Sequence, residues 1–385
     1  MNVEISRPLD GQWSEERARA WGLSHSWLCG FNFLPSSAVN FLEMWRGDSF
    51  DAASIDRELG WAAAIGFNAL RTNLHYLDWR HDPEGLIARV AQFLEIAAAH
   101  GLASMICLFD DCEFSGEPPH WGAQQGPRPG IHNGRAIGSP GRRLVGDRDL
   151  WPSLRDYVQG VIHAFAEDPR VAVWDLYNEP GNRMILEDGR QREHDHLLEN
   201  DSDALMRASF AWAREVGPTQ PLTVGAWRLG TPGAPAYAHR TDLAALALSD
   251  VVSFHAYCPL DRLRGVVADL QGHGRPMFCT EWMARGLDSR IRDQLPYLRS
   301  QGVGAFQWGL VRGRTQTHLP WPGVGIEMAL RDGGEPEWFH DILSEDGQPH
   351  CHDEVHTIRA ARGLIASAIA PATAESDVPA YRAQA

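Results

Sequence analysis

The stretch VAVWDLYNEP, residues 171–180, begins as an apolar run and ends on Asn178, Glu179 and Pro180. Apolar residues in consecutive rather than alternating positions are typical of a strand covered on both faces, as in a parallel sheet. The run PMFCTEW, residues 276–282, has the same form and brings Glu281 to its end. Because parallel strands end at the same edge of a sheet, the two carboxylates are expected on one side of the fold.

Six further runs of this kind lie outside these two, and segments with helical periodicity separate them. The alternation predicts a parallel sheet of β-α units, and eight units predict an α/β fold of the (β/α)8 (TIM) barrel type, with a doubly wound sheet as the alternative. The predicted strands are 28–34, 67–74, 103–109, 171–177, 221–227, 251–257, 276–282 and 303–310. The predicted helices are 51–65, 84–99, 150–166, 201–216, 241–248, 261–272 and 288–300.

The length of 385 residues, with 44% hydrophobic residues, is enough for one large core. We expect a single domain over residues 1–370, with the barrel core at about 28–310, C-terminal helices to about 370, and a loose tail at 371–385. Residues 110–149 and 181–200 are too long for ordinary connections. Both follow the carboxyl ends of predicted strands, the third and the fourth, and are expected to form walls of a functional site.

The formal charge is −15, and the sequence contains no lysine. An acidic surface repels phosphate backbones, so nucleic acid is not an expected partner. Without lysine there is no Schiff-base chemistry and no Walker A phosphate site.

The first residues lack the apolar segment of a signal peptide, and no run approaches the roughly 18 apolar residues of a membrane span. A cytoplasmic protein with no membrane partner is therefore expected. Cys29, Cys107, Cys258 and Cys279 lie in apolar runs and are expected to be free thiols, which fits a reducing compartment. The oligomeric state is left open.

Two glutamates at neighbouring strand ends provide the chemistry that breaks a glycosidic bond. One carboxyl group must donate a proton to the leaving oxygen, and the other must attack or activate water. A single glutamate after a strand is more often a surface charge. Glu179 and Glu281 together, one of them preceded by Asn178, favour a catalytic pair.

The Asn-Glu-Pro at 178–180 and the Thr-Glu-Trp at 280–282 resemble the strand-four and strand-seven ends of clan A glycoside hydrolases, most closely family 5. The resemblance implies that Glu179 is the acid/base, Glu281 the nucleophile, and Asn178 the ligand of the sugar 2-hydroxyl. It spans roughly residues 28–310 and departs from the family at the end of strand three, where Asp110 follows Phe109 at a place where histidine is common.

The same resemblance implies supporting roles for Arg71, His255, Tyr257 and Trp308. A cation such as Arg71 would keep Glu281 ionised, since it lowers the pKa of a nearby carboxylate. Tyr257 and His255 would hydrogen-bond in the site, and Trp308 would form the floor beneath a sugar. The alternatives are a structural ion pair for the arginine and core or structural positions for the others.

Asp110 is a candidate for binding distal hydroxyl groups, or else a cap of the loop that follows. Trp282 is a candidate sugar ligand at the end of the seventh strand. Trp121, Trp227 and Trp321 also lie at or beyond strand ends, and one or two of them are expected to line outer subsites. Residues 312–321, rich in polar donors, are a candidate cover for the sugar.

Histidine-rich segments at 193–196 and 350–356 raise the possibility of a metal site. The glutamate of the second segment does not stand where the metalloprotease pattern requires it. Histidines on polar helices are common, so no metal is expected.

These observations predict a retaining β-glycosidase that works by double displacement without a cofactor. Glu179 would need a raised pKa to be protonated at neutral pH. The expected substrates are short β-linked oligosaccharides or glycosides cleaved from one end. The alternatives are an endo-acting β-1,4-glycanase on glucan, mannan or xylan, a catalytically silent sugar-binding protein, and a transglycosylase.

Overall fold

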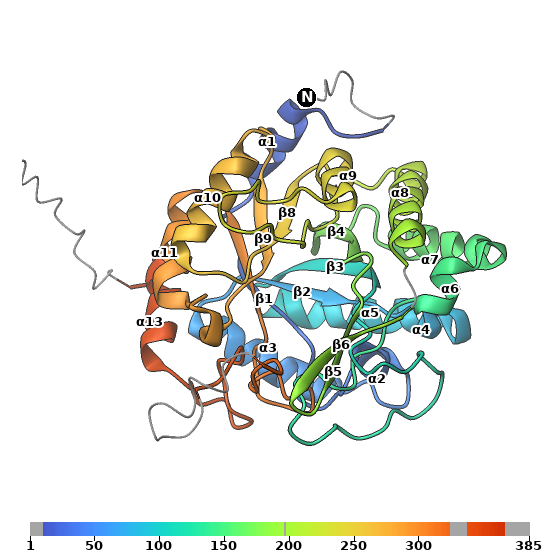
Figure 1. Cartoon of the computed structure of the whole chain (residues 1–385), viewed down its shortest axis with the longest axis horizontal. Coiled ribbons are helices and arrows are strands. Elements are labelled where there is room, and N and C mark those ends of the chain that lie inside the picture. The colour runs from blue at the N-terminus through green and yellow to red at the C-terminus, as the bar shows by residue number, and fades with distance from the viewer. Residues whose placement is uncertain (1–10, 196–197, 324–336, 366–385) are drawn as a thin grey trace, which may run out of the picture.

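The computed structural model describes residues 11–195, 198–323 and 337–365. Eight parallel strands form a nearly closed barrel surrounded by helices (Figure 1), which confirms the predicted fold class. Around the ring the order is β7-β4-β3-β2-β1-β10-β9-β8. The strands are β1 (Cys29–Asn32), β2 (Ala69–Asn73), β3 (Ala103–Asp110), β4 (Val171–Asn178), β7 (Leu222–Thr223), β8 (Val252–His255), β9 (Met277–Glu281) and β10 (Gly304–Trp308).

The ring closes beside the shortest strand, β7. Beyond its end, the amide of Ala226 donates to the carbonyl of Ser253 at 3.0 Å, and the amide of His255 donates back to the Ala226 carbonyl at 2.8 Å. These two hydrogen bonds join the strand-five segment to β8, so the barrel has no open edge on this side.

All seven predicted helices are present, with ends within a few residues of those expected. They are α3 (Ala52–Ile65), α5 (Pro83–Ala99), α7 (Trp151–Ala164), α8 (Glu199–Val216), α9 (Arg240–Leu248), α10 (Leu260–Gln271) and α11 (Ile291–Ser300). Four helices were not predicted: α1 (Glu15–Ser24), α2 (Phe41–Trp45), α4 (Tyr76–His81) and α6 (Arg142–Gly146). Another helix, α13 (His352–Ala361), lies in the C-terminal stretch where helices were expected. The described residues also contain two single 3₁₀ turns, η1 (Arg148–Leu150) and η2 (Arg285–Leu287).

The residues that point into the barrel change character along its axis. At the amino ends of the strands they form a small apolar cluster that includes Ala69, Val173 and Phe306. Side chains on a strand repeat every two residues, so the next inward layer carries Arg71 and Asp175, both fully buried. The polar layer therefore lies at the carboxyl ends of the strands, where a barrel carries its active site.

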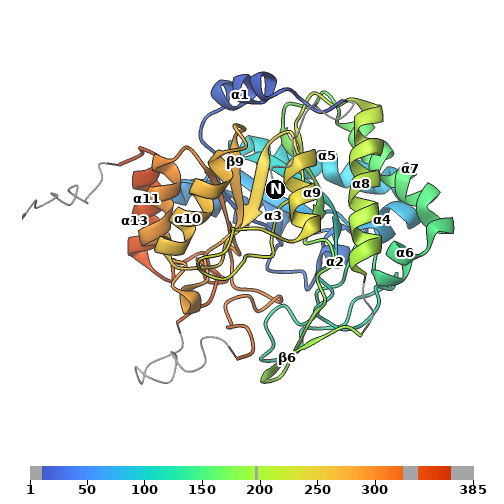
Figure 2. The same cartoon turned by 45° about the horizontal axis from the view of Figure 1, so that its top comes forward.

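The segment 181–200, predicted as a wall of the site, contains an antiparallel hairpin, β5 (Met184–Glu187) and β6 (Arg190–Glu193). The hairpin stands on the carboxyl side of the barrel. On the opposite side α1 packs beside β9, where Arg19 donates to the carbonyl of Gly274 at 2.7 Å. Figure 2 shows α1 and β6 at opposite sides of the molecule.

All six cysteines are free, and all except Cys351 are buried. Among the helices of the described residues, none is both long and apolar enough to cross a membrane. The tail predicted at 371–385 lies outside the described residues.

Candidate active site

Arg71 of β2 stands at the centre of the polar layer and joins its own strand to β4 and β9. Its Nη2 lies 2.8 Å from Asp175 and donates to Asn178 Oδ1 at 2.8 Å, and its Nη1 lies 3.1 Å from Glu281 Oε1. Burial opposes its charge, but Asp175 and Glu281 raise the pKa of Arg71 above its usual value. The arginine therefore remains charged and sets the positions of both strand-end motifs.

Glu281 ends β9 and is held from two sides. Besides Arg71 on Oε1, the hydroxyl of Tyr257 donates to Oε2 at 3.0 Å. Burial and the nearby charge of Glu179 raise its pKa, against the opposing effects of His255 and Arg71. The hydrogen bonds leave the carboxylate oriented, as a nucleophile must be before it attacks.

Glu179 follows β4 with φ of 44°, in the left-handed region that residues other than glycine adopt at an energetic cost. This turn aims its carboxylate at three donors. Oε1 lies 2.8 Å from His255 Nδ1, and Oε2 accepts from Asn182 Nδ2 at 2.6 Å and from Cys112 Sγ at 3.2 Å. The strained backbone and the three partners together hold the side chain in one orientation.

The pKa of Glu179 differs from the sequence-based expectation. Burial raises it, but the hydrogen bond and charge of His255, with the further donors Asn182 and Cys112, bring it below its usual value. The expected raised pKa is therefore wrong for the site without substrate. The pKa of His255 is raised instead: burial lowers it, but the charge of Glu281 and the hydrogen bond to Glu179 outweigh burial.

Asn178 is fixed by its neighbours on both sides. Its Oδ1 accepts from Arg71, and its Nδ2 donates to Asp110 Oδ1 at 2.9 Å. Asp110 also accepts from Asn73 Nδ2 at 3.0 Å, and burial raises its pKa to about 7. Asp110 thus lies in the site, as its predicted role as a ligand of sugar hydroxyl groups requires. It also accepts a hydrogen bond from the amide of Cys112, as the alternative role of a loop cap requires.

The side chains above surround a cavity of about 220 Å³. Its lining includes Trp308, the residue predicted to form the floor beneath a sugar. It also includes two of the tryptophans considered for outer subsites, Trp227 and Trp321. The sequence-predicted site residues among its lining are Asp110, Asn178, Glu179, His255, Tyr257, Glu281 and Trp308. Arg71 lies beneath them, fully buried.

Trp282 and Trp121 do not line this cavity. Trp282 is 1% exposed and packs in the core behind Glu281, because consecutive residues of a strand end point to opposite sides. Its expected role as a sugar ligand is not supported by this position. Trp121 stacks on His81 with ring centroids 4.5 Å apart, at an exposed place on the long loop after β3.

One wall of the cavity is a bridge between two distant segments, residues 128–133 and 315–321, which we call the loop bridge. The amide of Asn133 donates to the carbonyl of Thr315 at 2.7 Å, and Trp321 Nε1 donates to His132 Nε2 at 3.2 Å. Gln316 Nε2 donates to the carbonyl of Arg128 at 2.6 Å. The polar segment 312–321 therefore closes the cavity by binding the loop after β3.

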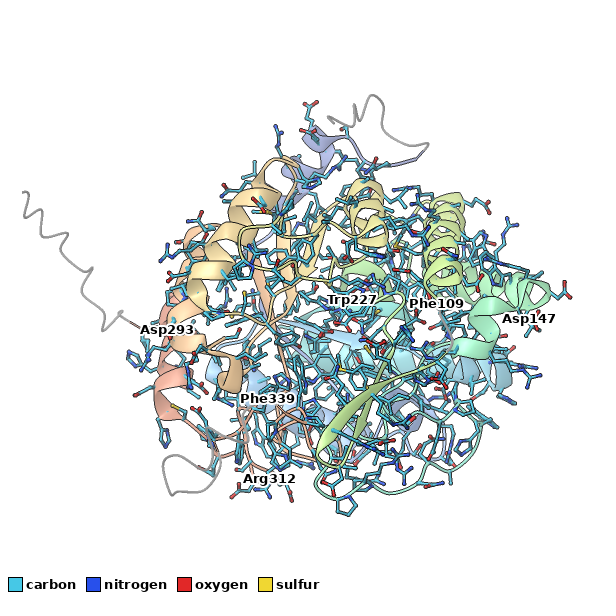
Figure 3. All side chains as sticks on the ribbon, viewed as in Figure 1. Phe109, Asp147, Trp227, Asp293, Arg312 and Phe339 are labelled. Carbon is cyan, nitrogen blue, oxygen red and sulfur yellow. The ribbon has the colours of Figure 1, made fainter. Side chains whose placement is uncertain are left out.

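One residue of the bridge, Trp321, also contacts the catalytic side. The ring of Trp321 packs edge-on against Tyr257, with centroids 5.1 Å apart, and Tyr257 holds Glu281. In Figure 3, Phe339 and Arg312 mark the part of the chain beyond β10, and Trp227 lies nearer the centre of the view.

The described residues contain one group of side chains able to share a metal ion, Glu179, His255 and Glu281, with ligand atoms within 4.8 Å of one another. Hydrogen bonds already pair these carboxylates with donors. The histidine-rich segment at 350–356 forms no such group. The ring of His350 stacks on that of Trp338, with ring centroids 4.4 Å apart. His196, at the end of the other segment, lies outside the described residues.

No family model matches the sequence, and no curated protein matches it. Solved structures do match. A β-1,4-mannanase from the sea hare Aplysia kurodai has a TM-score of 0.52 at 15% identity, covering 74% of this chain and 88% of its own. The barrel has the same fold as this β-1,4-mannanase.

Two more matches share this fold. A GH5_18 protein from Streptomyces cattleya, in complex with Manβ1-4GlcNAc, has a TM-score of 0.55 at 14% identity and covers 93% of this chain and 83% of its own. The exo-β-1,4-mannosidase Op5Man5 from an Opitutaceae bacterium has a TM-score of 0.54 at 18% identity, covering 88% of this chain but 60% of the longer protein. The predicted (β/α)8 barrel fold is thus shared with these three proteins.

Two partners of Glu179 were not predicted from the sequence. Cys112 lies two residues beyond the end of β3, and Asn182 lies four residues beyond the end of β4. The hairpin was missed as well. Its signal was Asp188-Gly189, a two-residue turn typical of a β-hairpin.

Proposed function

We propose that this protein is a retaining β-glycosidase that removes single sugars from the ends of short β-linked mannosides. The observation that carries the proposal is the approach of Glu179 and Glu281 across one cavity, with oxygens within 4.8 Å of each other. Carboxyl groups about 5–5.5 Å apart favour a covalent intermediate, whereas inverting enzymes separate them by about 6.5–9.5 Å to admit a water.

In the first step, a carboxylate oxygen of Glu281 bonds to the anomeric carbon. The bond from that carbon to the glycosidic oxygen breaks, its electron pair stays on the oxygen, and Glu179 supplies the proton. In the second step, Glu179 takes a proton from water, which attacks the anomeric carbon and frees Glu281. Both carboxyl groups end as they began.

His255 has a defined part in this sequence. Without substrate the directions of the pKa shifts favour a proton on His255 and a charge on Glu179, so the acid proton must cross the 2.8 Å hydrogen bond between them. When Glu281 becomes an ester it loses the charge that most raises the pKa of His255. A neutral His255 then leaves Glu179 free to act as the base.

The loop bridge supports action at a chain end. The leaving group must lie beside Glu179, the proton donor, so the sugar that is retained lies toward Trp308 and Trp321. The loop bridge stands on that side, and its hydrogen bonds leave less room for further sugars beyond the retained one. Endo action on a mannan requires an open groove there.

The choice of mannose rests on the names of the similar structures, which include mannanases and an exo-mannosidase. We also propose a cytoplasmic location, where short imported glycosides would be the available substrates. Fractionation of the native cells would test it.

The test is hydrolysis of nitrophenyl β-glycosides and of β-1,4-mannopentaose labelled at its reducing end. Exo action predicts release of unlabelled mannose only, with labelled products shortened one sugar at a time. Internal fragments would support the endo alternative. Binding without cleavage by the wild type would support the silent sugar-binding protein.

Retention is tested separately with Glu179→Ala and Glu281→Ala in the presence of azide. Azide should restore activity to Glu179→Ala by attacking the glycosyl-enzyme, which gives a β-glycosyl azide. It should give the α-product with Glu281→Ala, because it then enters from the side that the nucleophile vacated. The opposite pattern would exchange the two roles, and rescue of neither variant would overturn the double displacement.

A further inference from the structure

We infer that the β5–β6 hairpin and the segment after β7 form a binding site for a neutral sugar on the leaving-group side. The site is a second hollow of about 270 Å³, which we call the hairpin hollow, and it includes Asn182, Met184, Gln191, Trp227 and Arg228. This inference rests on the proposed function and adds to it the requirement for a second sugar in the preferred substrate.

The hairpin hollow adjoins the catalytic cavity, because Asn182, Met184 and Trp227 line both. Asn182 joins them chemically as well. Its Nδ2 donates to Glu179 Oε2 at 2.6 Å, and its Oδ1 accepts from the amide of Met184, the first residue of β5, at 2.7 Å. The residue that orients the proton donor therefore also anchors the hairpin.

This position is where the departing sugar must go. Glu179 donates its proton to the glycosidic oxygen, so the group attached to that oxygen extends past Glu179, away from Glu281. The next lining residues in that direction are Asn182, Met184 and Trp227. They lead into the hairpin hollow.

The lining suits a pyranose ring. The indole of Trp227 is half-buried and held in place: Nε1 donates to the carbonyl of Pro180 at 3.3 Å, and the guanidinium of Arg228 lies 4.3 Å from its ring centroid. Together with Met184 it offers apolar surface for the C–H face of a sugar. Gln191, on β6, offers an amide for its hydroxyl groups.

The charges of the hairpin hollow indicate that the sugar is neutral. Arg183 lies 2.8 Å from Glu193, Arg228 lies 3.7 Å from Asp242, and Glu199 is paired with His239. Each charged side chain of the lining thus has a polar partner, and both arginines have a carboxylate beside them. An aglycone that carries a phosphate or carboxylate would find no unpaired cation in this part of the described structure.

The test compares two substrates with one retained sugar and different leaving groups: β-1,4-mannobiose and β-mannosyl fluoride, whose leaving group is a single atom. We expect the ratio of kcat/KM for mannobiose to that for the fluoride to fall at least about tenfold in Trp227→Ala and in Met184→Ala, since loss of the leaving-sugar contacts affects only the disaccharide. Trp227→Phe should recover most of the ratio.

Trp121→Ala is the matched control, because Trp121 is an exposed tryptophan that lines neither hollow. It should leave the ratio at the wild-type value. Equal losses on both substrates in Trp227→Ala and Met184→Ala would overturn the inference, since that result indicates general damage to the site. If the wild type cleaves neither substrate, the proposed function fails instead.

Discussion

The two walls of the catalytic cavity are built from different kinds of contact. Behind Glu281, the loop bridge ties two segments nearly 200 residues apart with several hydrogen bonds, and Trp321 packs against the tyrosine that holds the nucleophile. Behind Glu179, the wall is a local hairpin that Asn182 links to the carboxylate, and the amide of Leu186 in β5 also donates to the carbonyl of Phe114 at 3.0 Å. A second hollow lies beside this wall.

The difference corresponds to what each carboxylate must do. A nucleophile forms a bond at one fixed place, so a closed wall and two firm partners suit Glu281. An acid/base exchanges protons with a leaving sugar and then with water, so its side must admit both. Enclosure and access are thus divided between the two sides of one small cavity.

The largest expected effect comes from removing each carboxylate in turn. Glu281→Gln should lower kcat/KM by about 10⁴-fold or more whatever the leaving group, since no covalent bond can form. Glu179→Gln should cost about 10³-fold on mannobiose but far less on a dinitrophenyl glycoside, whose leaving group needs no proton. Steady-state kinetics on both substrates measure these losses in kcat/KM. If the loss depended on the leaving group equally in both variants, the two carboxylates would not have the separate roles proposed here.

Opening the loop bridge should change where a chain is cut. Gln316→Ala with Trp321→Ala removes two of its contacts, and we expect the ratio of internal to terminal cleavage of labelled mannopentaose to rise roughly tenfold. Arg128→Ala is the control, because Arg128 contributes its backbone carbonyl to the bridge while its side chain pairs with Glu117. An unchanged ratio in the double variant would show that the bridge does not exclude sugars.

The pH profile should distinguish the partners of the two carboxylates. Without substrate His255 carries the acid proton, so its raised pKa sets the alkaline limb of kcat/KM. His255→Gln leaves that proton to the Glu179 carboxyl group alone, so the alkaline limb is expected to move down by about one unit. Tyr257 lowers the pKa of Glu281, so Tyr257→Phe should move the acidic limb up instead. A shift of the same limb in both variants would contradict separate control.

The smallest expected effect is that of Cys112. Its thiol lies 3.2 Å from Glu179 Oε2, and burial keeps the pKa of the thiol well above its usual value, so it acts as a weak neutral donor. Cys112→Ala should change kcat/KM by about threefold and move the alkaline limb slightly upward, whereas Cys112→Ser should restore the wild-type limb. A tenfold or greater loss in Cys112→Ser would assign the thiol a larger part.

The barrel could be predicted because its signal is local. Each strand is a short apolar run, and the two glutamates follow such runs directly, so sequence position translates into position on one rim. Trp282 shows the limit of this reasoning. It is adjacent to Glu281 in sequence, but the alternation of side chains sends it into the core.

Features that depend on distant contacts were beyond the sequence. The loop bridge depends on the hydrogen bond between Asn133 and Thr315, and neither residue lies in a sequence pattern that predicts this contact. The β6 strand, Arg190–Glu193, is polar and exposed throughout, so no apolar periodicity marked it. The direction of the Glu179 pKa shift depended on the 2.8 Å approach of His255, a residue from another strand.

The burial of five of the six cysteines has a practical consequence. Cys351, the residue before α13, is the one thiol with appreciable exposure, so a maleimide dye should attach mainly there. Because the sequence contains no lysine, the maleimide has no lysine side chain with which to react as a side reaction. The protein as it stands is thus suited to site-selective attachment of a fluorophore or a surface tether without any engineered residue.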